Sequence, residues 1–195
     1  MQTTPNNNIP DANVEYVRRL YENVLDWYKS AENKAQIIVT LDGIFVTFVT
    51  TSMFDSKNIG VAQLPLITLG FLGLMIVSLA ISLYHAISCL WSRTYTPDEL
   101  AEALRQAGVN ISDYQTYKPS TSWFFQMINA LDREQFEKRV HHLEQGFEVD
   151  ALASQIYLLS ANVSKKHTHV NFGFAFGALT FLLFVLSGVS YLIIK

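Results

Sequence analysis

The sequence predicts an all-α membrane protein with three transmembrane helices and a cytoplasmic helical bundle that is continuous with the first and third of them. Two observations lead to this prediction. Segments 35–54, 64–90 and 170–194 are each apolar over the roughly 20 residues that cross ~30 Å of hydrocarbon as an α-helix. Only 16% of the chain is charged, against about 25% in soluble domains, and Asp42 is the one charged residue inside the three segments.

The chain before the first span divides into two parts. Residues 1–12 are rich in Asn, Thr and Pro, lack the basic and apolar regions of a signal peptide, and are expected to be disordered. Residues 13–34 are expected to form a cytoplasmic amphipathic helix, because apolar residues recur at spacings of three and four. These residues are Val14, Val17, Tyr21, Val24 and Tyr28. No Gly or Pro separates this helix from the span, so the two either form one long helix or bend at 30–33.

The first two spans are expected to run antiparallel. The hairpin at 55–60 is too short to allow another arrangement. Pro65 is expected in the first turn of the second span, where a missing N–H costs little.

The segment 93–169 is expected to begin with a capped helix. Thr96 and Glu99 form a candidate capping box, and Pro97 takes the first helical position. Gly108 is the expected stop, because glycine is the usual residue just past a helix end.

Beyond this stop, the sequence predicts a loop and two further helices. Residues 109–119 are expected to form the loop, and 120–131 a short aromatic helix. The last helix is expected to start near Asp132, to change register near Gly146, and to continue without a break into the third span. Its first apolar stripe is Phe136, Val140, Leu143 and Phe147, and its second is Leu152, Ile156, Leu159 and Val163.

The distribution of positive charge predicts the orientation. Of the 14 Lys and Arg residues, only Lys57 and Lys195 lie in the hairpin or at the C-terminal end. The others precede the first span or lie between the second and third. The positive-inside rule therefore places the N-terminus and 93–169 in the cytoplasm and the C-terminus on the opposite side.

Two polar residues lie inside the spans at a similar depth. A carboxylate at the centre of a membrane helix costs ~2.5–3.5 kcal/mol on insertion scales, and less near the interface. We therefore put forward the hypothesis that Asp42 and His85 face each other or a shared polar cavity, with a lining or gating role. The alternative is that Asp42 snorkels to the interface and His85 is interfacial.

Small residues mark one face of the third span. Gly173 and Gly177 fit the small-xxx-small pattern of close helix contact. This face is expected to serve either as an oligomer interface or for packing inside the chain. Three spans are too few to enclose an aqueous path, so the protein is expected to work in the bilayer as a homo-oligomer that forms a pore.

The sequence lacks the signatures of catalysis, metal binding and nucleic-acid binding. No phosphate-binding loop, dinucleotide fingerprint, zinc-protease motif or CxxC occurs, so neither enzymatic activity nor a cofactor is expected. The His pairs 141–142 and 167–169 point to different helix faces, which argues against a metal site. A net charge of −3 predicts no nucleic-acid partner.

A small anionic ligand fits the segment 93–169 better. Basic residues can bind phosphate, and aromatic rings can stack on bases. The candidates are Tyr95, Tyr114, Tyr117, Lys118, Trp123 and Arg133. The alternative is that the aromatic residues form an interfacial belt or the core of the bundle.

Three blocks of sequence resemble the Pycsar-type transmembrane effectors. The block AENKAQIIVTLDGIF at 31–45 resembles the entry of that family's first span. The blocks at 123–140 and 148–170 are similar to its "FF-x-x-I" and "QIY-x-L-A … K" segments. The chain departs from the family's pattern at Asn33, where an acid is expected, and at Phe136, where Tyr is expected. The matching positions are Lys34, Ala35, Phe124, Phe125, Gln155, Tyr157 and one of Lys165 or Lys166.

The resemblance implies an anti-phage effector of the bacterial inner membrane, with its C-terminus periplasmic. In that family a partner cyclase makes a cyclic nucleotide on infection. The effector senses this signal, oligomerises or opens and disrupts the membrane, and growth of the infected cell stops or the cell dies. The alternatives are a ligand-independent scaffolding membrane protein and a channel subunit.

The matching residues suggest where the signal is received. The expected cyclic-nucleotide site lies near the junction of the spans with the bundle, where a Lys would bind the phosphate and a Tyr or Gln the base. Its residues are Lys34, Gln155, Tyr157, Lys165 and Lys166. The alternative for Lys165 and Lys166 is that they anchor the third span to anionic lipid.

Overall fold

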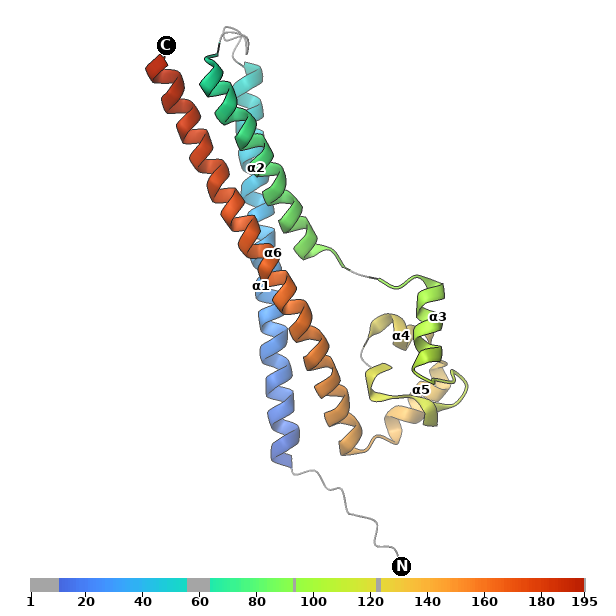
Figure 1. Cartoon of the computed structure of the whole chain (residues 1–195). Helices are drawn as coiled ribbons and strands as arrows, with labels where there is room; N and C mark the ends of the chain where they lie inside the picture. The colour runs from blue at the N-terminus through green and yellow to red at the C-terminus, as the bar shows by residue number, and fades with distance from the viewer. Residues whose placement is uncertain (1–10, 56–63, 93, 122–123, 195) are drawn as a thin grey trace, which may run out of the picture. The chain divides into compact units, whose positions relative to one another are not determined.

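The computed structural model describes residues 11–55, 64–92, 94–121 and 124–194 (Figure 1). All regular structure in these residues is helical, which confirms the predicted fold class. Residues 1–10, expected to be disordered, and 56–60 of the expected hairpin lie outside the described residues. Positions 11 and 12, also expected to be disordered, are instead helical. The helices are α1 (Asp11–Asp55), α2 (Leu66–Leu90), α3 (Pro97–Gln106), α4 (Phe125–Ala130), α5 (Arg133–His141) and α6 (Gln145–Ile194), with 3-10 turns η2 (Tyr114–Thr116) and η3 (Pro119–Thr121).

The chain forms two compact units. The membrane unit comprises Tyr28–Trp91 and Val163–Lys195, and the helical unit comprises Met1–Trp27 and Ser92–Asn162. Three described helices, α1, α2 and α6, are long and apolar enough to cross a membrane. The first and third of them extend from one unit into the other.

α1 is one uninterrupted helix, so the amphipathic helix and the first span form one long helix and do not bend at 30–33. The buried positions explain this continuity. Val14 and Val24 in its first half, and Ala31, Ala35 and Ile38 in its second, follow one spacing of three and four residues. Because the spacing does not change between Val14 and Ile38, one uninterrupted helix keeps these residues on one face.

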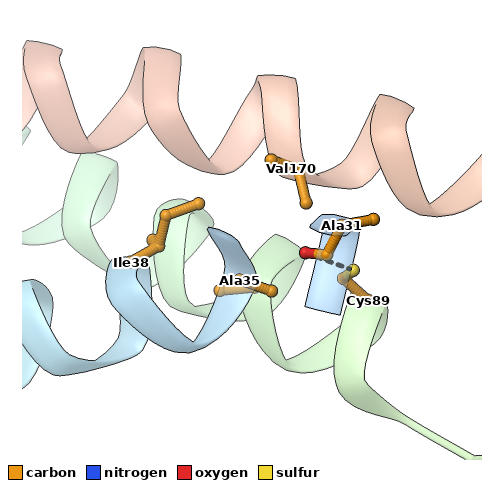
Figure 2. Packing of buried hydrophobic residues seen from close by; sticks show 6 residues of the cluster. Ala31, Ala35, Ile38, Cys89 and Val170 are labelled. Carbon is orange, nitrogen blue, oxygen red and sulfur yellow. Dashed lines mark hydrogen bonds between the residues drawn. The ribbon is translucent and has the colours of Figure 1, made fainter. Parts of the chain in front are cut away.

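In the membrane unit, α1, α2 and α6 lie side by side and share a small apolar core (Figure 1). Figure 2 shows Ala31, Ala35 and Ile38 of α1 meeting Cys89 of α2 and Val170 of α6. The small side chains let the helix backbones approach closely, as is typical of membrane helices. Large apolar residues such as Ile44, Ile76 and Phe181 are exposed on the outer faces, where lipid replaces water as the solvent.

α2 begins two residues later than the span predicted from the sequence. Pro65 is its N-cap residue, and the first helical residue is Leu66. The helix ends at Leu90 because Trp91 is extended, with φ −65° and ψ 117°. The ring of Pro65 has no N–H, which suits a position where an N–H would lack a helical acceptor in any case.

The helical unit begins as the sequence predicts. The Glu99 N–H donates to Thr96 Oγ1 (3.4 Å), and the Thr96 N–H donates to Glu99 Oε2 (2.9 Å), which completes the capping box. Gly108 follows the end of α3 with φ +68°, a backbone conformation that favours glycine.

A second apolar core lies in the part of the helical unit that follows α2. Its buried residues are Leu104, Tyr117 and Leu131. Tyr117 is only 1% exposed, and its hydroxyl donates to the Ile111 carbonyl at 2.5 Å. Burial is the first cause that raises the pKa of Tyr117 above its ordinary value. The aromatic ring of Tyr117 therefore lies in the core of the bundle, which was the alternative to a place in the ligand site. Trp123, another candidate for that site, lies outside the described residues.

The predicted helices between 120 and 170 need two corrections. The aromatic helix is shorter than predicted, since only Phe125–Ala130 is α-helical. The last helix is also not continuous from Asp132. α5 ends at His141, His142 leaves the helical conformation with φ −118° and ψ 32°, and α6 starts at Gln145. This break lies where the sequence predicted a change of register. Val140 and Leu143 of the first predicted stripe are exposed, so the stripe does not form a continuous buried face.

Candidate functional site

The polar residues of the three membrane helices divide between the outside and the inside of the membrane unit. On the exposed side, the hydroxyls of Thr40, Thr47 and Thr51 donate to carbonyls four residues back in their own helix. On the inside, a set of polar residues is buried between the helices. These are Asp42, Thr68, Ser78, Ser82, Thr180, Ser187 and Ser190. We call these seven residues the polar seam.

Asp42 occupies a core position of α1. It follows Ile38 by four residues on the buried stripe, and it is 6% exposed. Ser82 Oγ of α2 lies 2.7 Å from Asp42 Oδ2 and 3.0 Å from the Gly173 carbonyl oxygen of α6. One hydroxyl therefore connects all three membrane helices at the same level.

Further polar contacts join α2 to α6 along the seam. Ser78 Oγ of α2 donates to the Phe176 carbonyl of α6 at 2.9 Å, and Thr180 Oγ1, within α6 itself, donates to the same oxygen at 2.8 Å. Thr68 Oγ1 and Ser190 Oγ lie 3.0 Å apart. Because lipid offers no hydrogen bonds, these hydroxyls of Thr68, Ser78, Ser82, Thr180 and Ser190 bond to a neighbouring helix or to their own.

His85 has a different partner from the one considered in the sequence. Its Nδ1 atom lies 3.0 Å from His169 Nδ1 of α6, and its ring stacks on Phe172 with centroids 5.2 Å apart. Asp42 is paired with Ser82 instead, so the direct pair of Asp42 with His85 is corrected, because each of the two residues has a closer partner on a neighbouring helix. A shared polar cavity at the two residues stays a prediction. The matching depth of His85 and His169, near the same ends of their spans, was the sequence signal for this contact.

Lys166 is held in a cluster of its own inside the membrane unit. Its Nζ atom donates to Glu32 Oε1 at 2.9 Å and to the Cys89 carbonyl at 2.5 Å, and it lies 4.5 Å from the centre of the Tyr28 ring. The acceptor at Cys89 lies in the last turn of α2, where a cation is favoured by the helix dipole. The side chain of Lys166 is 12% exposed, so its role in this structure is to join α1, α2 and α6.

The other residues of the expected nucleotide site are more accessible. In the membrane unit, Lys34 and Lys165 are exposed. In the helical unit, Gln155 is half-buried and Tyr157 is 78% exposed. The part of these residues in binding a nucleotide stays a prediction.

The glycine face of α6 lies inside the chain. A Cβ atom on Gly173 would lie 3.1 Å from Ile38 Cδ1, and one on Gly177 would lie 3.4 Å from Ser82 Oγ. Of the two predicted uses of this face, packing inside the chain is therefore the one that the structure has. The expectation of an oligomer interface at these two glycines is corrected, because their space is filled by α1 and α2.

Metal binding has no support in the described part of the chain. No group of three or more His, Cys, Asp or Glu side chains there is placed to hold a metal ion. The chemistry that the site offers is instead that of a buried carboxyl group, a pair of imidazoles and several hydroxyls between membrane helices.

Comparison with known proteins identifies the family. A family model described as the Pycsar effector protein domain matches residues 16–194, which include α2, α3, α4, α5, α6 and all of α1 except its first five residues. No curated protein and no solved structure matches the chain. The family match and the three membrane-length helices make this a transmembrane protein of antiviral defence, associated with a cyclic-nucleotide signal from a cyclase, and the chain belongs to the Pycsar effector family.

Proposed function

We propose that the protein is the effector that disrupts the bacterial inner membrane when it senses a cyclic nucleotide made by its partner cyclase. Its N-terminus and helical unit would lie in the cytoplasm and its C-terminus in the periplasm. The observation that best supports this proposal is the polar seam. Anchoring alone does not require a carboxyl group and several hydroxyls between membrane helices, because an apolar interior would avoid the cost of burying them.

The seam also indicates how the membrane would be breached. Ile38 and Ser82 fill the space beside Gly173 and Gly177. The three helices of one chain are therefore tightly packed at this level. A path for water or ions would therefore need separation of the helices and rearrangement of several copies, with the seam turned toward water. We infer a homo-oligomer whose contacts use surfaces other than the glycine face.

The proposal is tested with the full chain in vesicles that contain a fluorescent dye. Cyclic pyrimidine and purine nucleotides are added in turn, and dye release is measured. We expect release with one nucleotide class and none without nucleotide. Release that needs no nucleotide would favour a channel, and no release with any nucleotide would favour a scaffolding protein.

Two pairs of substitutions separate the candidate receptor residues. One variant carries Gln155→Ala with Tyr157→Ala, and the other carries Lys34→Ala with Lys165→Ala. We expect at least one of them to lose nucleotide binding in a direct titration. Thr47→Val, on the exposed side of α1, is the matched control and should bind and release dye as the unaltered chain does. If all variants bind equally, the receptor site lies elsewhere.

A further inference from the structure

Ser82 lies between two hydrogen-bond acceptors but has one proton to donate. Its Oγ atom is 2.7 Å from Asp42 Oδ2 and 3.0 Å from the Gly173 carbonyl oxygen. A hydroxyl has one donor and two acceptor lone pairs. Both short contacts can therefore be hydrogen bonds at the same time only if Asp42 carries a proton of its own and donates it to Ser82 Oγ, while Ser82 donates to Gly173.

An ionised Asp42 fits this arrangement poorly. The Ser82 proton would go to the carboxylate, and the oxygen pair at 3.0 Å would then have no hydrogen between its members. Among the described residues, no Lys, Arg or His forms an ion pair with Asp42. A negative charge would remain between membrane helices with a single hydroxyl to stabilise it, which is costly.

A protonated Asp42 satisfies every contact. The carboxylic acid donates to Ser82 Oγ, and the Ser82 hydroxyl donates to the Gly173 carbonyl. This oxygen has a second lone pair beyond the one used in the ladder of α6. The two bonds form a chain in which each polarises the next. No net charge is left in the bundle.

We propose that Asp42, Ser82 and the Gly173 carbonyl form a proton-binding site, in which Asp42 is a neutral carboxylic acid as long as the three helices are packed. When α1 separates from α2 and α6, the O–H bond of Asp42 breaks heterolytically, the proton passes to water, and the carboxylate is solvated. The coupling of this release to opening rests on the proposed function, whereas the bound proton does not.

The neighbours of Asp42 do not supply another charge at this level. On α1, the next buried residue toward the N-terminus is the apolar Ile38. Ser82 of α2 and Gly177 of α6 face Asp42, and Gly173 of α6 lies against Ile38. The nearest titratable pair along these helices is His85 with His169, which are hydrogen-bonded to each other.

Infrared difference spectroscopy tests the bound proton directly. The carbonyl band of a carboxylic acid is distinct from the bands of a carboxylate, and the difference between the unaltered chain and Asp42→Asn isolates one residue. Asn keeps the size of Asp and can donate to Ser82, so this variant should fold. At neutral pH and without nucleotide we expect a protonated band in the unaltered chain, although exposed aspartates ionise near ~4. If the unaltered chain shows no such band at neutral pH, the proposal is overturned.

Ser82→Ala, compared with Ser78→Ala, tests the relay. Both serines are buried in α2 and donate to α6, but only Ser82 touches Asp42. We expect the protonated band of Ser82→Ala to disappear at a lower pH than that of the unaltered chain. The band of Ser78→Ala should disappear at the same pH as that of the unaltered chain. If the two variants titrate alike, Ser82 is not part of the proton site.

Dye release at several pH values tests the coupling separately. If opening releases one proton per subunit, the ratio of open to closed subunits rises ~10-fold for each unit of pH between the pKa values of the two states. Less nucleotide should then be needed at higher pH, and this dependence should vanish in Asp42→Asn. A protonated band together with pH-independent release would refute the coupling, and a protonated band with no release at all would refute the proposed function while leaving the proton site intact.

Discussion

Lys166 illustrates how a single charge is accommodated beside a membrane bundle. Its ammonium group lies against a carboxylate, a carbonyl and an aromatic ring, which together replace its hydration shell. The same lysine was a candidate for binding a nucleotide phosphate. In this structure an incoming phosphate would have to displace Glu32, so Lys166 acts first as a link between helices.

We expect Lys166→Met to destabilise the membrane unit by about 2 kcal/mol. This is less than the ~3–5 kcal/mol of a fully buried pair, because the Glu32 side chain is 31% exposed. Thermal unfolding in detergent measures the change. Lys165→Met, at the exposed neighbouring position, is the control and should unfold almost as the unaltered chain does.

The double variant Glu32→Gln with Lys166→Met tests the reason for this loss. If the loss comes from an unpaired Glu32, neutralising both partners should restore part of the stability. Equal stability of the single and double variants would show that the ion pair contributes little.

Among the elements, α6 owes its close fit to its small residues. The face at Gly173 and Gly177 receives Ile38, Ser82 and Asp42. Gly188 on the same helix has nothing within 4 Å of its Cβ direction. The spacing of the glycines gives no sign of this difference, because it depends on which neighbour each one meets.

We expect Gly177→Leu to lower the stability of the bundle by roughly 1–3 kcal/mol, since extra methylenes in a packed interior force the helices apart. Gly188→Leu should have a much smaller effect. Unfolding of the protein in detergent, under conditions where it is monomeric, provides the measurement. Unchanged stability of Gly177→Leu in the monomer would argue against packing inside the chain.

The capping box of α3 predicts a local dependence on pH. The Thr96 backbone N–H first, and then its hydroxyl, donate to Glu99 and lower the pKa of this carboxyl. A group with a lowered folded-state pKa stabilises the fold above its unfolded pKa, and this contribution is lost as pH falls through the folded value. We therefore expect the start of α3 to fray in acid, below the ordinary range of Glu.

Nuclear magnetic resonance of the Thr96 amide can follow this change. Its chemical shift should titrate with Glu99 and become insensitive to pH in Glu99→Gln, whose amide still accepts a hydrogen bond. Thr96→Ala should weaken the helix start by ~1 kcal/mol at every pH. A shift that titrates equally in Glu99→Gln would assign the effect to another acid.

On the scale of the whole molecule, the distribution of Lys and Arg predicts the topology. Reporters fused at Lys57 and after Lys195 should be periplasmic, and one at Tyr114 should be cytoplasmic, because positive charge stays on the cytoplasmic side. Paired reporters that are active on opposite sides provide the measurement. A cytoplasmic signal from the fusion after Lys195 would contradict the three-span orientation.

Assembly is the second expectation at this scale. Cross-linking in native membranes should give a ladder above the monomer, and the ladder should persist in Gly177→Ala, because this face lies inside the chain. Large apolar residues exposed on the outer faces of the membrane helices provide area for such contacts. Only monomer, with and without nucleotide, would exclude a pore built from several copies.

The sequence by itself determined the features that depend on neighbours along the chain. The length and apolarity of three segments predicted the membrane helices. The thickness of the hydrocarbon layer sets the length of a span, and its lack of water requires apolar side chains. Thr96, Pro97 and Glu99 predicted the start of α3, and Gly108 predicted its end, because capping involves residues only a few positions apart. The matched blocks of sequence predicted the family.

The tertiary structure alone decided which side chains meet across helices. Rotating one helix about its axis leaves its composition and length unchanged but exchanges every partner, so the sequence of α2 could not show that Ser82 meets Asp42 while His85 meets His169. The pairing of Lys166 with Glu32 was missed for the same reason, and the sequence left open whether Tyr117 binds a ligand or lies in the core of the bundle. Each depends on contacts between residues far apart in the chain, and close packing settles those contacts only when all the helices are in place.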